Sequence, residues 1–342
     1  MKPPAHILVI RLSAMGDVAM TVPVLLKLVE GYPDIQLTVI SRKLFKPFFE
    51  DIPNISFLEA DVKGAHKGLV GIVKLAKQAK KLHITTVADL HNVIRTKVMR
   101  RYFTSFSIKV AKIDKGRAEK RAITKASGKP LKPIKSTHER YADVFRKLGY
   151  ALDLQPPLFL KRKPWPAKIS EKITSKKRIG IAPFAAYQSK MYPLDLMKEV
   201  IQTLEATNEY QMFLFGSLEE KNALETLVLN SNTIINTAGM FSLEEELALI
   251  SNLDVMVSMD SGNGHLAAMY GIPVITLWGV THPFTGFVPF HQPMENQLIS
   301  DVEKYPLLPT SVYGNKFPKG YEKVMESIKP VSVVNKIEEV LS

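Results

Sequence analysis

Residues 257–268 read Val257-Ser258-Met259-Asp260-Ser261-Gly262-Asn263-Gly264-His265-Leu266-Ala267-Ala268. This stretch ends a β-rich apolar run, turns through two glycines and begins an apolar helical pattern. A helix that starts at the carboxyl end of a strand offers free backbone N–H groups, and its dipole favours an anion such as a diphosphate. His265 falls in the first turn of this helix, near any phosphate bound there. The motif taken alone fits an ordinary strand-to-helix turn with a structural histidine equally well.

A second turn of the same kind lies near the start of the chain. The apolar run 6–12 predicts a buried strand, and a helical pattern follows from Val18 to Leu28. Asp17 lies at the turn between them, where the dipole of the helix keeps a carboxylate ionised. Such a carboxylate can accept a proton from a substrate hydroxyl. Capping of the helix by Ser13 or Asp17 is the alternative role.

β-rich segments alternate with helical patterns along both halves of the chain, which predicts parallel sheets. The expected strands are Ile7–Leu12, Gln36–Ile40, Ile55–Leu58, Thr85–Asp89, Ser107–Val110, Ile179–Ala182, Gln211–Phe215, Thr233–Asn236, Leu253–Ser258 and Val274–Trp278. The charged, proline-containing residues 161–178 interrupt the pattern and predict a linker. We therefore expect an α/β protein with two doubly wound, Rossmann-like domains, 1–160 and 179–330, followed by a final helix in 331–342.

Composition supports two domains and limits the chemistry. A chain of 342 residues with 46% hydrophobic residues can form two substantial cores. It contains no cysteine, which excludes disulfides and thiolate metal sites, and we find no convincing metal-ligand spacing. The first residues predict a strand rather than a signal peptide, and no stretch is apolar enough to span a bilayer. We expect a cytoplasmic protein.

The charge is unevenly distributed. Residues 1–160 contain 29 Lys and Arg against 13 Asp and Glu, whereas residues 161–342 contain 17 against 20. One basic segment, residues 112–135, predicts a mobile loop and contains Lys112, Lys115, Arg117, Lys120, Arg121, Lys125, Lys129, Lys132 and Lys135. A second cluster, Lys74, Lys77, Lys80 and Lys81, follows a helical pattern that can lie against an anionic membrane. Both can also be solvated faces. We expect no nucleic-acid partner, because zinc-finger spacing and RNA-binding aromatic motifs are missing.

The order of the motifs resembles a known family. Arg-x-Ser-x-x-Gly-Asp followed by Thr-x-Pro stands here as Arg11, Ser13, Gly16, Asp17, Thr21 and Pro23. Asp-[Ser/Thr]-Gly-x-x-His-Leu-x-Ala stands as Asp260, Ser261, Gly262, His265, Leu266 and Ala268, and Gly279, Thr281 and Pro283 follow as Gly-x-Thr-x-Pro. These motifs, over nearly the whole chain, resemble glycosyltransferase family 9, the lipopolysaccharide heptosyltransferases and their relatives.

This resemblance implies a GT-B fold, in which an acceptor-binding and a nucleotide-sugar-binding domain face across a cleft and the final helix packs back on the first domain. It implies inverting, metal-independent transfer of a sugar, best known as heptose from ADP-heptose. The acceptor would be a lipopolysaccharide core or similar anionic glycolipid at the cytoplasmic surface of the inner membrane. The nucleotide sugar is a co-substrate, and no cofactor is expected. Donor sugar, acceptor and oligomeric state stay open.

The resemblance also assigns roles to residues. Asp17 would be the catalytic base. The donor diphosphate would bind Lys190, Ser261, Gly262 and His265. Asp260 would contact the donor sugar or order its loop, and the nucleotide would bind Glu219 or Glu220 together with Met240 and Phe241. Acceptor-side candidates are Ser13, His91, Asn92, Arg95, Lys120 and Arg121. Around Lys190, Met191 and Tyr192 depart from the family's Lys-x-Trp-Pro motif. A surface lysine is the alternative for Lys190, and ordinary loop hydrophobes are the alternative for Met240 and Phe241.

Two other functions fit parts of the sequence. A nucleotide-sugar 2-epimerase would pair two similar domains but would need no basic acceptor surface. A non-catalytic polyanion-binding protein would use only the basic first domain. Neither a dinucleotide fingerprint nor a P-loop occurs, which argues against a dehydrogenase and a P-loop NTPase. Turnover of a nucleotide sugar only in the presence of an acceptor separates the three possibilities.

Overall fold

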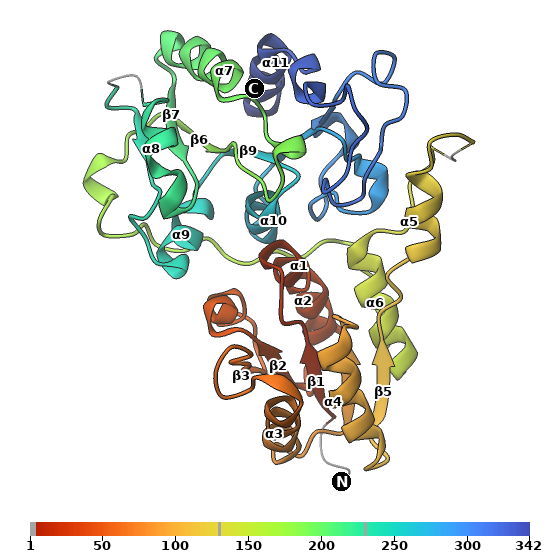
Figure 1. The fold of residues 1–342 in the computed structure, drawn as a ribbon. Coiled ribbons are helices and arrows are strands. Elements are labelled where there is room, and N and C mark those ends of the chain that lie inside the picture. The colour runs from red at the N-terminus through yellow and green to blue at the C-terminus, as the bar shows by residue number, and fades with distance from the viewer. Residues whose placement is uncertain (1–4, 129–130, 229–230) are drawn as a thin grey trace. The chain divides into compact units, whose positions relative to one another are not determined.

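The computed structural model describes residues 5–128, 131–228 and 231–342. The chain divides into two compact units (Figure 1). The first unit contains Met1–Lys115 and Thr137–Leu160, and the second contains Gly116–Ser136 and Lys161–Ser342. The boundary after residue 160 is where the sequence places it. The prediction that all of 1–160 forms one domain is wrong for Gly116–Ser136.

The first unit contains a five-stranded parallel sheet in the order β3-β2-β1-β4-β5. Its strands are β1 (His6–Ile10), β2 (Gln36–Ser41), β3 (Ile55–Glu59), β4 (Thr86–Asp89) and β5 (Lys109–Lys112). Its helices are α1 (Met15–Ala19), α2 (Val22–Gly31), α3 (Gly68–Lys80), α4 (Ile94–Thr104) and α6 (Thr137–Leu148). The predicted helix from Val18 to Leu28 is split into α1 and α2, because Pro23 fits only in the first turn of a helix.

The second unit contains a six-stranded parallel sheet in the order β11-β10-β9-β6-β7-β8. Its strands are β6 (Lys177–Ala182), β7 (Tyr210–Leu214), β8 (Ile234–Asn236), β9 (Val255–Met259), β10 (Val274–Trp278) and β11 (Gln297–Ile299). Its helices are α5 (Arg117–Ile123), α7 (Leu194–Thr207), α8 (Lys221–Glu225), α9 (Leu243–Ile250), α10 (Gly262–Met269) and α11 (Pro330–Leu341). Short 3₁₀ helices, among them η3 (Gln188–Lys190) and η4 (Leu218–Glu220), occupy loops.

Both sheets have a topological switch point. In the first, β1 lies between β2 and β4, and in the second, β6 lies between β7 and β9. Ligands of doubly wound sheets bind outside the carboxyl ends of the strands at such points. The loops after β1, β4, β6 and β9 are therefore where each unit can build a site. The buried strands are apolar because helices cover both faces of a parallel sheet.

The linker segment and the last helix of the second unit differ from the sequence prediction. The predicted linker 161–178 packs on this unit: the backbone N–H of Lys163 donates to Ser251 Oγ at 2.9 Å, and Asn252 Nδ2 donates to the Lys163 carbonyl at 2.7 Å. The last helix, α11, joins the core of the same unit beside α7 through Val333 and Ile337. The apolar face of this helix is therefore buried in the second unit, whereas the sequence prediction placed it against the first domain.

The basic segment is not the predicted mobile loop. Its middle forms α5, and the backbone N–H of Ile134 donates to the carbonyl of Phe284 at 3.0 Å. The ammonium of Lys120 lies 4.0 Å from the centre of the Phe287 ring, and Lys120 is buried. A lysine can bury its stem and ammonium in this way because an aromatic face attracts a cation. Lys129 lies outside the described residues. In the described part of the chain, no helix is long and apolar enough to cross a membrane.

Candidate active site

Asp17 lies in α1, directly after the loop that follows β1. Its Oδ2 is 2.6 Å from Nη2 of Arg11 and accepts the backbone N–H of Ala14 at 3.3 Å. The hydroxyl of Tyr141, from α6, donates to the Asp17 carbonyl at 3.1 Å and fixes the backbone. The side chain of Asp17 is 29% exposed, whereas that of Arg11 is 8% exposed. The carboxylate is thus held in one position and still reaches solvent.

Arg11 connects Asp17 to the end of β4. Its Nη1 donates to the carbonyl of Leu90 at 2.8 Å. The next residue, Leu12, donates its backbone N–H to Nδ1 of His91 at 3.4 Å, so the proton of the neutral ring belongs on Nε2. Burial, together with the nearby charges of Arg11, Lys115 and Arg95, lowers the pKa of His91 to about 3. His91 is therefore a neutral hydrogen-bond donor near neutral pH.

The loop after β4 is ordered by Asp89. Oδ1 of this buried carboxylate accepts the backbone N–H groups of His91 at 3.0 Å and Asn92 at 2.8 Å. Arg100 of α4 pairs with Oδ2 of Asp89 and donates to Asn92 Oδ1 at 3.1 Å. These bonds hold Asn92 in a left-handed conformation, with φ of 46°. The sequence predicts His91 and Asn92 as site residues but does not reveal the Asp89–Arg100 pair that positions them.

The acceptor-side candidates fall in different units. Asp17, His91 and Asn92 come together around Arg11 and Asp89 in the first unit, with Ser13 half-buried in the loop before α1 and Arg95 exposed at the start of α4. Lys120 and Arg121 belong to α5 in the second unit. They therefore lie outside the first unit, where the sequence prediction placed them, because the segment that carries them packs on the loop around Phe287.

Lys190 lies in η3, after β6, and is only 8% exposed. Its Nζ donates to the Asp260 carbonyl and lies 3.3 Å from Asp260 Oδ2. This placement excludes the alternative of a surface lysine. Gly314 packs on the lysine stem, because a Cβ at Gly314 would lie 2.6 Å from Cγ of Lys190. Ser189 Oγ donates to the carbonyl of the same glycine. The loop around Gly314 was not predicted, since only its glycine marks it in the sequence.

The turn after β9 has the predicted form. α10 begins at Gly262, and Ser261 precedes it in an extended conformation. Ser261 Oγ is buried and has no hydrogen-bond partner among the described residues. His265 is 7% exposed in the first turn. Gly264 is required for close packing, since a Cβ there would lie 2.6 Å from Ser258 Oγ. A helix start with free N–H groups and an unsatisfied hydroxyl suits an anionic ligand.

The nucleotide candidates lie in two loops of the second unit. Glu220 Oε2 accepts the backbone N–H of Ser217 at 2.7 Å and so caps the turn after β7. Glu219 is exposed, and hydrogen bonds from its own N–H and from Ser217 lower its pKa. Met240 and Phe241 are half-buried between β8 and α9. Glu219 is therefore the more available of the two carboxylates.

Tyr192 occupies the place where the family motif has tryptophan. Its ring is buried in the core of the second unit, and its hydroxyl donates to the carbonyl of Ile328 at 2.8 Å. Burial raises the pKa of this hydroxyl. Tyr192 therefore supports the loop of Lys190 from behind. Among the described residues, no group of three or more His, Asp or Glu side chains could hold a metal ion.

Known heptosyltransferases are similar to this chain in sequence and in fold. The lipopolysaccharide core heptosyltransferase OpsX of Haemophilus influenzae is 28% identical over 301 residues, which are 82% of this chain and 80% of OpsX. The solved glycosyl transferase family 9 structure from Veillonella parvula has a TM-score of 0.78 at 20% identity and covers 100% of this chain and 98% of its own. Escherichia coli ADP-heptose lipopolysaccharide heptosyltransferase II has a TM-score of 0.68 at 20% identity and covers 98% of both chains.

These solved structures share the fold. The family itself is shown by the model for glycosyltransferase family 9 (heptosyltransferase), which matches residues 72–317. That match includes the Lys190 loop and the whole turn after β9. The chain therefore belongs to glycosyltransferase family 9.

Proposed function

We propose that this glycosyltransferase moves heptose from ADP-heptose to the core of lipopolysaccharide, or to a similar anionic glycolipid, with inversion at the anomeric carbon. The names of its relatives support this choice, since OpsX is a lipopolysaccharide core heptosyltransferase and the E. coli enzyme uses ADP-heptose by name. The observation that carries the proposal is a cation–carboxylate pair at the switch point of each sheet, Arg11–Asp17 in one and Lys190–Asp260 in the other.

Asp17 is the proposed base. The acceptor hydroxyl must lose its proton as it attacks the anomeric carbon, and a positioned carboxylate can take that proton. Arg11 and the Ala14 N–H both bind Oδ2. In this proposal Oδ1, the other carboxylate oxygen, takes the proton. His91, whose Nε2 carries the proton, donates a hydrogen bond to the acceptor, and Asn92, Arg95 and Ser13 surround the same position.

The diphosphate is the leaving group, and its negative charge grows as the bond to the sugar breaks. Lys190, the N–H groups after Ser261 and the side chain of His265 stabilise that charge. A lysine and a helix start can supply this stabilisation without a metal ion. Activity that survives treatment with EDTA is therefore the expected result. A loss of turnover in EDTA that added magnesium restores would contradict metal independence.

The rest of the donor binds the loops of the second unit. Asp260 accepts hydrogen bonds from sugar hydroxyls once the diphosphate engages Lys190. Glu219 binds the ribose, and Met240 and Phe241 contact the base. The basic residues of the first unit attract the anionic acceptor, and the enzyme associates peripherally with the cytoplasmic surface of the inner membrane.

The test measures ADP release from ADP-heptose, with and without a lipopolysaccharide core precursor that lacks heptose. We expect release only when the acceptor is present, and a product that is heavier by one heptose. UDP- and GDP-sugars serve as donor controls. Epimerisation of a nucleotide sugar without acceptor, or acceptor binding without any turnover, would favour the epimerase or the polyanion-binding protein instead.

A further inference from the structure

A groove on the first unit lies between α4 and β5 and encloses about 610 Å³. Among the described residues β5 is the edge strand of the sheet and pairs with β4. Val110 and Lys112 are two residues apart on this strand and therefore share one of its faces. The volume lies in the range of pockets that hold small ligands. Nothing in the proposed chemistry at Asp17 requires this groove.

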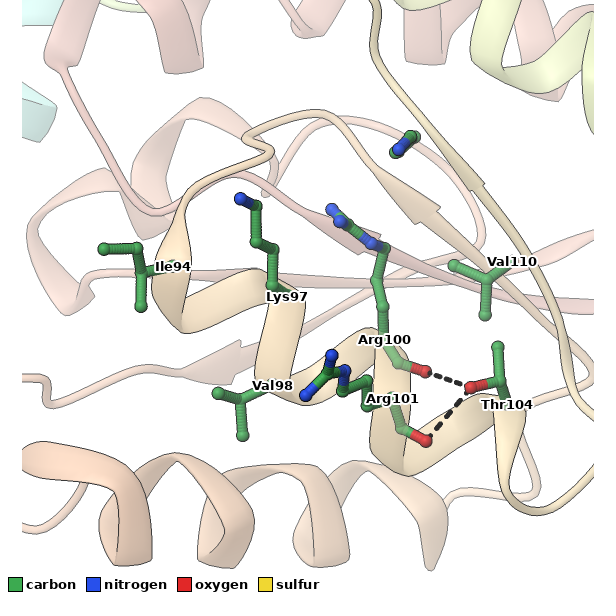
Figure 2. A pocket seen from close by; sticks show the side chains of 8 residues that line it. Ile94, Lys97, Val98, Arg100, Arg101, Thr104 and Val110 are labelled. Carbon is green, nitrogen blue, oxygen red and sulfur yellow. Dashed lines mark hydrogen bonds between the residues drawn. The ribbon is translucent and has the colours of Figure 1, made fainter.

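The face of α4 that lines the groove combines cations with apolar side chains. Ile94, Lys97, Val98 and Arg101 recur at intervals of three and four residues and so lie on one side. The other side carries the buried Met99 and Phe103. Figure 2 shows that Lys97 and Arg100 extend from the helix in the same direction. The hydroxyl of Thr104 is used by the helix itself, since it donates to the carbonyls of Arg100 and Arg101 at 3.0 Å.

Four cations therefore line one groove. Lys97, Arg101 and Lys112 are exposed, and in the part of the chain that the structure describes none of them pairs with an acid. Arg100 is mostly committed to Asp89 and Asn92 through Nη1. A planar guanidinium can still donate from its other nitrogens. Three unpaired cations beside the apolar side chains of Ile94, Val98 and Val110 match a phosphate group attached to a less polar body.

The groove borders the proposed acceptor site through Arg100. Lys112 lies opposite Asp89 in the register of β5 and β4. The carbonyl of Ile113, the next residue, accepts from Asn92 Nδ2 at 3.0 Å. Arg100 spans both regions, because it lines the groove and holds Asp89 and Asn92. Arg100 therefore lies between a hydroxyl bound near His91 and a phosphate bound in the groove.

We propose that the groove between α4 and β5 binds phosphate groups of the glycolipid acceptor at a distance from the reacting hydroxyl. This inference rests on the proposed function for its acceptor. Bound phosphate would give the acceptor a second anchor, which orients it and favours phosphorylated over unphosphorylated glycolipids. Each phosphate brings between one and two negative charges, which the three unpaired cations neutralise.

The test compares wild type with Lys97→Gln/Arg101→Gln, which removes two charges and keeps long polar side chains. Lys172→Gln/Lys319→Gln, at exposed positions of the second unit, is the matched control. Binding of the phosphorylated acceptor is measured by calorimetry without donor, and then repeated with phosphatase-treated acceptor. We expect a roughly 25-fold weaker Kd for the groove variant, at about fivefold for each cation. The control variant should bind like wild type, and all three proteins should bind the dephosphorylated acceptor equally.

Two further measurements distinguish the phosphate of the acceptor from that of membrane lipids, and they separate the role of the groove from the proposed glycosyltransferase function. Binding to phosphatidylcholine vesicles, with and without phosphatidylglycerol, should be the same for wild type and the groove variant. An unchanged acceptor Kd in the groove variant overturns the proposal, as does a loss confined to phosphatidylglycerol vesicles, which would make the groove a general lipid contact. ADP release from ADP-heptose is recorded in parallel. Absence of release in wild type would refute the proposed function, while the calorimetric result still decides the role of the groove.

Discussion

Asp17→Asn should separate catalysis from folding. The amide keeps an oxygen that can accept the Ala14 N–H but loses the charge that pairs with Arg11 at 2.6 Å. Removing one partner of a fully buried ion pair costs about 3–5 kcal/mol. Asp17 is 29% exposed, so water compensates in part, and we expect a loss of about 1–2 kcal/mol. For a domain of this size the melting temperature should fall by roughly 3–6 °C.

The effect on turnover should be much larger than the effect on stability. A positioned general base contributes about 10²–10⁴-fold to the rate, or roughly 2.7–5.5 kcal/mol of activation free energy. The assay is ADP release at saturating acceptor, at a temperature where thermal melts show the variant folded. ADP affinity, measured by calorimetry, should stay unchanged, because the nucleotide candidates belong to the other unit.

Arg11→Gln is the matched control. It breaks the same ion pair and leaves the carboxylate in place, so it should lose comparable stability and much less activity. If Arg11→Gln is as inactive as Asp17→Asn, turnover depends on the order of the loop after β1 and not on the carboxylate of Asp17. Turnover of Asp17→Asn at the level of wild type would refute the assignment of the base outright.

The remaining predictions concern single side chains. Lys190→Met should weaken ADP binding by one to two orders of magnitude, as expected for a charge-assisted contact of about 1.5–3 kcal/mol; calorimetric binding like that of wild type would contradict a diphosphate role. Burial raises the pKa of Glu246 to about 7. The folded state therefore loses stability as pH rises from about 4.5 to 7, and Glu246→Gln should be more stable than wild type by about 3 kcal/mol at pH 8 and equal at pH 4 in chemical denaturation. The ring signals of His91 should not shift in NMR spectra between pH 8 and 5, since its pKa is about 3; a midpoint near 6.5 would show a solvated ring. Lys120→Glu should destabilise the protein by about 1–2 kcal/mol through its lost aromatic contact, whereas Arg121→Glu, at an exposed position, should change stability by less than about 0.5 kcal/mol.

The sequence predicts the sheets well, because parallel strands that are covered on both faces read as apolar runs between helical patterns. Each of the ten expected strands is present, with shifts of up to two residues at their ends. β11 was missed, since its sequence, Gln297-Leu298-Ile299, is short and is not enriched in β-branched residues. The helix start after Ser261 was predicted correctly from the glycines that follow a β-rich run.

The errors arise where contacts link distant parts of the chain. Composition marks residues 112–135 as charged and therefore exposed, but Lys120 is buried against Phe287, which no local pattern reveals. Motifs identified Lys190 and Asp260 as separate candidates. Their pairing across 70 positions required the fold, because it depends on β6 and β9 lying side by side. The same limit applies to Arg100 and Asp89, whose pairing depends on how α4 packs beside β4.

The two ion pairs at the switch points differ in a way that fits different tasks. In Arg11–Asp17 the cation is buried and the carboxylate is the more exposed partner, so an incoming hydroxyl meets the acid while the arginine holds it in place. In Lys190–Asp260 both side chains are about 10% exposed, so a ligand anion must exchange with Asp260 to reach the ammonium. That exchange leaves the buried ammonium of Lys190 paired throughout, because one anion replaces another beside it. Under the proposed roles, it also frees the carboxylate of Asp260 to accept hydrogen bonds from the part of the ligand next to the diphosphate, so we expect binding of the diphosphate and recognition of the attached sugar to be coupled.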